Sequence, residues 1–213
     1  TAGAISGERE RRTFNLLRTT LLPARKLVVG KLLSALAYIV LLLLVAVPLQ
    51  SLAFLMGGIS IEEVLLSVEL LLVTAIGYGA VGLFFSAITK RTLTASILTY
   101  TFALIATIAL PLATLVLAIF TSSAGAPSSA FLQPVLTIAL GLLGSTNPSA
   151  TAVLTEVILQ QKGSAFFFTE TLASGATLPL VSPWVVYTLI YLAGTVILVL
   201  ATVRAVQRTQ ASD

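Results

Sequence analysis

The sequence predicts an all-α fold, a polytopic bundle of transmembrane helices that lies mostly within the lipid bilayer. Hydrophobic residues make up 57% of the chain and charged residues only 9%, whereas a soluble domain has about 45–50% and about 25%. The charges also leave long gaps, because residues 32–61, 70–89, 92–155 and 171–203 carry none. A membrane β-barrel would need alternating strands, and apolar runs such as Ile39 to Val47 do not alternate.

Four of the apolar stretches are long enough to span a bilayer as helices. A helix needs about 20 mostly apolar residues to cross a hydrocarbon layer of about 30 Å, and its backbone groups must bond to one another there. The predicted spans cover residues 31–56, 64–88, 93–120 and 183–203. The last span opens with Ser182 as N-cap and Pro183 in its first turn. We therefore treat residues 1–213 as a single transmembrane domain.

Residues 121–182 separate the third span from the fourth. The apolar stretch at 131–144 is too short for an ordinary span and is typical of a re-entrant or interfacial segment. Breaks are expected at Pro127, Pro134, Asn147-Pro148 and Gly163. We expect an external helical region that dips into the membrane.

The positions of the basic residues predict the orientation. Cytoplasmic loops concentrate Lys and Arg. With four spans, eleven of the twelve basic residues fall on one side, and Lys162 alone falls on the other. We expect residues 8–31, 89–92 and 204–213, including the C-terminus, to be cytoplasmic.

Several kinds of chemistry are excluded by composition. The chain has no cysteine and no histidine, so it offers no thiolate nucleophile, no disulfide and no Cys/His zinc site. Gly30-Lys31 does not complete a phosphate-binding loop, because position 25 is Arg and position 32 is Leu. We predict no catalytic residue, no metal and no cofactor on this chain.

Two features of the second predicted span invite interpretation. A stripe of small residues on one helix face allows close approach of another helix, and its members are Ala75, Gly79, Gly82 and Ser86. The partner is either a second subunit or the same bundle. Glu69 is the one ionisable residue well inside a span. It either lines a translocation path or extends outward to water.

Residues 8–22 predict a short amphipathic helix at the membrane surface, ended by Pro23. Its first turns contain Glu8 and Glu10, which suit the positive end of a helix dipole. The apolar stripe consists of Phe14, Leu17 and Leu21, beside a polar stripe with Arg11 and Arg18. By itself this pattern also fits a helix that lies on a membrane.

The same segment resembles the coupling-helix region of type-2 ATP-binding-cassette (ABC) exporter permeases. The resemblance rests on Glu-Arg-Glu-Arg-x-Thr from Glu8, a Leu-rich turn, Thr-Leu-Leu-Pro-Ala-Arg-Lys from Thr20, and Gly30-Lys31 before a span. The later Lys90-Arg91-Thr92 loop and the Ser182-Pro183-Trp184 start agree. Arg12 replaces a frequent Gly, and Thr20-Leu21 replaces Thr-Pro. Such permeases have six spans, so the resemblance implies a fragment that lacks the first two.

The resemblance implies the membrane subunit of an ATP-driven exporter in a prokaryotic plasma membrane. Its expected partners are a cytoplasmic ATPase, which carries ATP and Mg²⁺, a second permease half and the lipid bilayer, with no nucleic acid. The coupling helix would contact the ATPase through Glu8, Glu10, Arg11, Phe14, Leu17, Arg18 and Leu21. The chain itself would not be an enzyme. The rival hypothesis is a non-transporting anchor that recruits a cytoplasmic partner. The residues do not identify a substrate.

Overall fold

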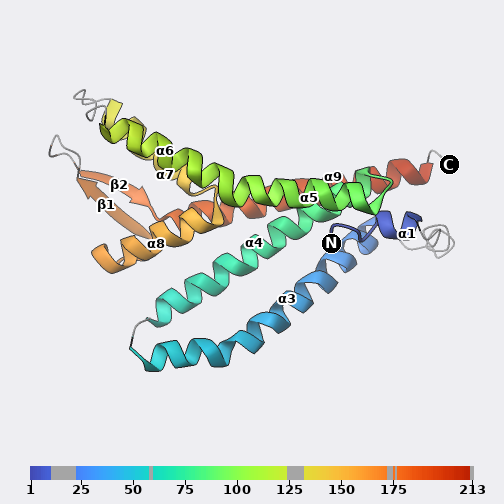
Figure 1. Cartoon of the computed structure of the whole chain (residues 1–213), viewed down its shortest axis with the longest axis horizontal. Helices are drawn as coiled ribbons and strands as arrows, with labels where there is room; N and C mark the ends of the chain where they lie inside the picture. The colour runs from blue at the N-terminus through green and yellow to red at the C-terminus, as the bar shows by residue number, and fades with distance from the viewer. Residues whose placement is uncertain (11–22, 58–59, 124–131, 172–174, 176, 212–213) are drawn as a thin grey trace. The chain divides into compact units, whose positions relative to one another are not determined.

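The computed structural model describes residues 1–10, 23–57, 60–123, 132–171, 175 and 177–211, and Figure 1 shows the order of its elements. The chain forms two compact units. Unit 1 consists of Thr1–Ser60, Leu71–Ala103 and Tyr191–Asp213, and unit 2 of Ile61–Leu70 and Leu104–Ile190. Each unit is described by itself below.

The long helices are α3 (Ala24–Leu55), α4 (Ile61–Ile88) and α9 (Pro183–Ala211). A further helical stretch consists of α5 (Thr92–Leu104), a π-helical turn η1 (Ile105–Ala109) and α6 (Leu110–Ser123). Among the described residues, four stretches are long and apolar enough to cross a membrane: Ala24–Leu49, Ile61–Ile88, Thr92–Val116 and Pro183–Arg208. The prediction of four helices that are long and apolar enough to span a membrane is thereby confirmed. Helix α3 begins at Ala24, directly after Pro23 and seven residues before the predicted start of the span at residue 31. An apolar composition marks the part of a helix that lies in lipid, and the helix itself extends beyond that part.

Apolar side chains on these helices face outward. In α3, Leu44, Val45 and Leu49 are 65%, 66% and 70% exposed. A soluble protein rarely leaves so large an apolar surface in water, so lipid is the solvent that this surface fits.

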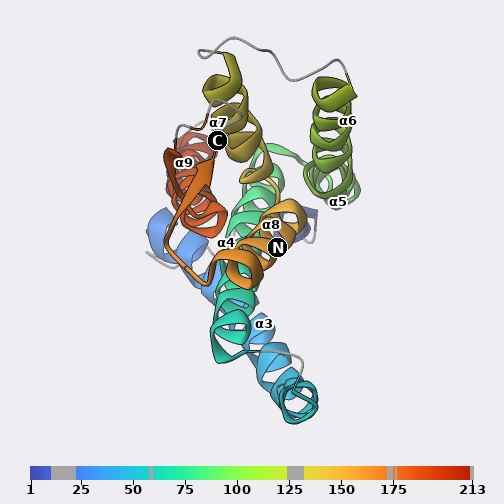
Figure 2. The same cartoon turned by 90° about the vertical axis from the view of Figure 1, so that its left-hand side faces the viewer.

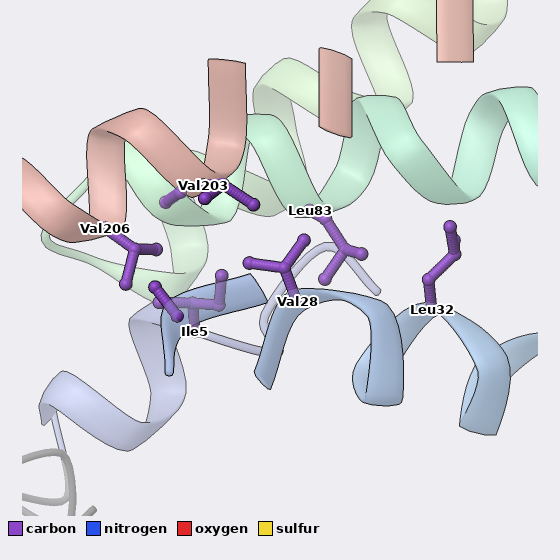
Figure 3. Close-up of a cluster of buried hydrophobic side chains, with 8 residues drawn as sticks. Ile5, Val28, Leu32, Leu83, Val203 and Val206 are labelled. Carbon is purple, nitrogen blue, oxygen red and sulfur yellow. The ribbon is translucent and has the colours of Figure 1, made fainter. Parts of the chain in front are cut away.

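Unit 1 has a small apolar core formed by residues from the N-terminal segment, α3, α4 and α9. Its buried members are Ile5, Ala24, Val28, Leu32, Leu83, Ala87, Val203 and Val206. Figure 3 shows Ile5, Val28 and Val206 gathered where these segments meet, and all three are fully buried. Within the spans, close packing of such aliphatic side chains stabilises the contact through van der Waals attraction. This core holds residues 1–10 against the bundle.

Unit 2 contains α7 (Leu132–Gly144) and α8 (Pro148–Lys162), which follow one another across a short turn (Figure 2). Asn147 is the N-cap of α8, and Gly163 ends that helix in the left-handed conformation with φ 59°. An antiparallel hairpin follows, in which β1 (Phe167–Thr171) pairs with β2 (Thr177–Val181). The expected short helix near 131–144 is present, whereas the hairpin was not predicted.

Candidate functional site

Residues 1–10 are attached to helix ends through a set of polar contacts that we call the N-terminal clamp. The clamp comprises Ser6, Glu8, Arg9 and Glu10, together with their partners Lys31, Ser86, Thr89 and Thr92. All of these residues belong to unit 1. The short helix α1 (Ser6–Glu10) carries the first four of them.

Ser86 forms the buried centre of the clamp. Its Oγ accepts hydrogen bonds from the backbone amides of Ile5 at 2.8 Å and Ser6 at 2.9 Å. The first amides of a helix have no partner within that helix. A side chain of α4 therefore satisfies the start of α1. Ser6 and Ser86 are both fully buried, and their hydroxyl oxygens lie 3.2 Å apart.

The small-residue stripe of α4 faces the N-terminal residues and α3 of the same chain. A Cβ at Gly82 would lie 2.5 Å from Thr1 Oγ1, and a Cβ at Gly79 would lie 3.0 Å from Leu32 Cδ1. Ala75 and Gly79 help to line a cavity of about 600 Å³ in unit 1. Small side chains at these positions leave room for the segment that leads into α1, and Ser86 then bonds to it.

Three consecutive charged residues of α1 each contact a different partner segment. Glu8 forms an ion pair with Lys31 of α3 at 2.6 Å, and Lys31 Nζ also donates to the carbonyl of Ala4. Arg9 Nη1 donates to the carbonyl of Thr89, just after α4, at 3.4 Å. Glu10 accepts from Thr92 at the start of α5. The clamp thus joins α1 to α3, the end of α4 and α5.

The contact between Glu10 and Thr92 is a helix cap supplied from a distant part of the sequence. One carboxylate oxygen accepts from the Thr92 amide at 2.9 Å, and the other accepts from the Thr92 hydroxyl at 2.6 Å. A negative charge at this position also suits the positive end of α5. The hydroxyl bond, followed by the amide bond, lowers the pKa of Glu10 below its ordinary value of 4.5.

The structure covers only the beginning of the expected coupling helix at 8–22. Arg11, Phe14, Leu17, Arg18 and Leu21 lie outside the described residues. Glu8 and Glu10 are described, and the contacts above place their carboxylates on residues of the same chain. Contact of any of the seven residues with an ATPase stays a prediction.

Glu69 lies in unit 2, where it contacts α9. Its Oε1 accepts a hydrogen bond from Thr188 Oγ1 at 2.7 Å, and its buried Oε2 has no hydrogen-bond partner among the described residues. Thr188 comes five residues after Pro183, so it lies roughly 8 Å along the axis from the start of α9 at about 1.5 Å per residue. The carboxyl group therefore lies near one end of α9. Its role in a translocation path stays a prediction.

Asn147 is a buried polar residue whose role the sequence analysis missed. Its Oδ1 accepts from the Ala150 amide at 2.9 Å, which caps α8, and its Nδ2 donates to the carbonyl of Ala106 in η1. The side chain is 1% exposed. The signal was the Asn-Pro pair itself, since Asn favours the N-cap position and Pro favours the next.

The four long apolar helices found among the described residues have apolar outer surfaces, which define this chain as a polytopic α-helical membrane protein. Residues 1–208 match the family described as ABC-2 family transporter protein. Because the match covers nearly the whole chain, the protein belongs to this family and is a membrane permease component of an ABC transporter. No curated protein and no solved structure matches it.

Proposed function

We propose that the chain couples ATP hydrolysis on a separate ATPase subunit to export of a substrate across the membrane. Family membership supports the permease role. The observation that carries the coupling role is the N-terminal clamp, because it ties the segment leading into residues 11–22 to three membrane helices. A helix that receives a force can transmit it only through such attachments.

In this proposal the ATPase binds the helix at 8–22 and displaces it when ATP binds and is hydrolysed. The apolar ridge of Phe14, Leu17 and Leu21 supplies anchors at helical spacing, and Arg11 and Arg18 orient the docking. Glu8 transmits the displacement to α3 through Lys31. Glu10 transmits it to α5 through Thr92. Two permease halves and two ATPase subunits would rearrange between access states.

The remaining assignments complete the proposal. The basic residues support a cytoplasmic position for the clamp and the C-terminus in a prokaryotic plasma membrane. Because the exporter permeases that the chain resembles have six spans, we propose that the working permease carries two further spans. Glu69 would line the path, and its buried Oε2 supports a polar role there. ATP and Mg²⁺ would bind the partner subunit, so this chain needs no cofactor.

Purification of the permease with a co-expressed ATPase from the same gene neighbourhood tests this function. Phe14→Ala should weaken the association by about 1–3 kcal/mol if Phe14 is a central anchor. Glu10→Ala should weaken the association less than Phe14→Ala, because charges orient docking more than they supply affinity, and it should reduce the permease-dependent stimulation of ATP hydrolysis in lipid vesicles. Glu62→Ala serves as the control, since Glu62 is exposed and lies at the start of α4, far along the sequence from the clamp.

The rival anchor function predicts a different result. A non-transporting anchor would retain a cytoplasmic partner, and Glu10→Ala would change neither ATP hydrolysis nor any ATP-dependent movement of solutes. If no ATPase associates with the unmodified permease, the coupling function is wrong. If an ATPase associates but Phe14→Ala and Glu10→Ala both behave like the control, the assignment of the coupling helix is wrong.

A further inference from the structure

The hairpin β1–β2 has one half-buried face and one exposed face. Side chains alternate between the two faces of a strand. Lys162, the last residue of α8, lies on the same face as Phe168 and Glu170. Its Nζ is 5.5 Å from the Phe168 ring centroid and 2.5 Å from Glu170 Oε2. The side chains of the other face are all exposed: Phe167, Thr169 and Thr171 on β1, and Thr177, Pro179 and Val181 on β2.

The open face changes from apolar to polar along its length. At the base, Phe167 pairs with Val181, and these side chains are 71% and 43% exposed. Toward the tip, Thr171 pairs with Thr177, which places hydroxyl groups on the same face. Phe166, just before β1, is a further exposed aromatic residue at the base.

Three contacts fix the base of the hairpin to the start of α9, which is a membrane span. The Ser182 amide donates to the carbonyl of Phe166 at 2.8 Å. Trp184 Nε1 donates to the carbonyl of Ala165 at 2.6 Å. The rings of Phe166 and Trp184 pack edge to face, with centroids 5.2 Å apart. The base of the hairpin therefore lies at the depth at which α9 begins.

The depth at which α9 begins indicates that lipid, at the boundary between headgroups and acyl chains, covers the apolar base of the hairpin. Trp and Tyr concentrate at the boundary between acyl chains and headgroups, where one end of a side chain meets lipid and the other meets water. Trp184 stands in the first turn of α9, where such a residue is expected, and its contacts with Ala165 and Phe166 hold the base of the hairpin beside it. Phe167 and its pairing partner Val181 are both exposed, and Val181 lies two residues before the start of α9 at Pro183.

We propose that Phe166, Phe167 and Val181 form an interfacial anchor that inserts into the boundary between headgroups and acyl chains of the leaflet in which α9 begins. The threonines at the tip then stand in water. The partner of this surface is the lipid bilayer and not a second protein. The anchor fixes how deep α9 begins in the membrane and how the hairpin is oriented relative to the membrane surface. It depends on the membrane topology alone and is independent of ATP-driven export.

Single cysteines test the anchor, because the chain contains no other cysteine. Phe167→Cys and Val181→Cys report on the base, and Thr171→Cys and Thr177→Cys are matched controls on the same face of the same strands. Each variant of the whole chain is spin-labelled and reconstituted in phosphatidylcholine vesicles. Its collision rates with oxygen, which concentrates in lipid, and with a water-soluble nickel chelate are then measured.

The expected result is a higher ratio of oxygen to nickel collisions at 167 and 181 than at 171 and 177. Equal ratios at all four positions would overturn the proposal. Low collision rates with both reagents at 167 and 181 would also overturn it, because they would show that protein covers the base.

The unmodified protein supplies a second measurement, since Trp184 is the single tryptophan of the chain. Lipids brominated near the headgroup should quench its fluorescence more than lipids brominated near the end of the acyl chain. The reverse order, or no quenching by either lipid, would place the base of the hairpin elsewhere and overturn the anchor.

Discussion

The N-terminal clamp of unit 1 and Asn147 of unit 2 both connect helices through polar side chains, but they differ in charge. We call Asn147, with its bonds to Ala150 and Ala106, the joint. The clamp combines the neutral Ser86 hydroxyl with an ion pair and a carboxylate cap near the surface. The joint uses one neutral amide, which caps α8 and bonds to η1. Changes in salt or pH therefore alter the strength of the charged contacts of the clamp, at Glu8 and Glu10. They leave the hydrogen bonds of the joint unchanged.

This difference suits two mechanical roles. Neutral hydrogen bonds in buried sites are costly to break, because each buried group left without a partner lowers the stability of the fold by about 1–3 kcal/mol. Exposed ion pairs contribute about 0–1 kcal/mol and reform readily. In the proposed function, the buried Ser86 bonds would fix α1 on α4. The charged contacts of Glu8 and Glu10 would pass the displacement of α1 to α3 and α5.

The largest effect is expected at the centre of the clamp. Ser86→Ala removes the acceptor of two buried amides and should destabilise the protein by about 2–4 kcal/mol, since each unsatisfied donor costs about 1–3 kcal/mol. The measurement is reversible unfolding in mixed detergent micelles, followed by circular dichroism. Ser67→Ala on the same helix is the control, because Ser67 is exposed and bonds only to the carbonyl of Val64 in its own turn. Equal effects of the two changes would contradict the role of Ser86.

The joint should respond almost as strongly. Asn147→Ala removes the cap of α8, worth about 1 kcal/mol, and leaves the Ala106 carbonyl without this donor, worth about 1–3 kcal/mol. The total loss should be about 2–4 kcal/mol and should not change with salt. Asn147→Ser keeps an oxygen that can cap α8 but removes the amide group that donates to the Ala106 carbonyl. It should therefore recover only the stability that the cap contributes. If the serine variant is as unstable as the alanine variant, the cap contributes nothing.

The Glu8–Lys31 pair should give a smaller, salt-dependent effect that separates the clamp from the joint. These side chains are 28% and 19% exposed, so the pair is partly screened. Glu8→Gln should cost about 1 kcal/mol at low salt and less at high salt. The same unfolding measurement at two salt concentrations checks this, with Asn147→Ala as the salt-independent reference. A salt-independent loss at Glu8 would show that the pair acts by packing and not by charge.

The sequence predicted the membrane part of the fold well, because the spans are local patterns of apolar residues. It also placed Glu8 and Glu10 in a helix, and both lie in α1, which begins at Ser6. It pointed to the stripe of small residues that ends at Ser86. It could not give the partners of these residues. Glu10 was assigned to the dipole of its own helix, whereas it caps α5, 82 positions away. Such pairings depend on tertiary packing, which leaves no local pattern.

The hairpin and the joint escaped prediction for related reasons. The strands β1 and β2 are five residues each, and the alternation over so short a length is indistinguishable from a loop next to a span. Asn147-Pro148 was interpreted only as a break. The hydrogen bond to Ala106 joins segments 41 positions apart and ends in the π-helical turn η1, and a contact over that distance leaves no local pattern in the sequence.

The smallest effect concerns the titration of Glu10, which is fully exposed. Its pKa in the folded protein is lowered below 4.5 by the hydroxyl and amide of Thr92. A lowered pKa means that the contact stabilises the folded state fully above about 4.5 and is lost as the pH falls through the lowered value. Amide hydrogen exchange at Thr92, corrected for the intrinsic pH dependence, should show protection at neutral pH and less in acid. Glu10→Gln keeps one acceptor oxygen but cannot titrate. In this variant the Thr92 amide should be less protected at neutral pH than in the unmodified protein, and its protection should not change in acid. If the unmodified protein and Glu10→Gln show the same protection at neutral pH, the carboxylate charge does not hold α1 to α5, and the clamp then depends on Ser86 and Lys31.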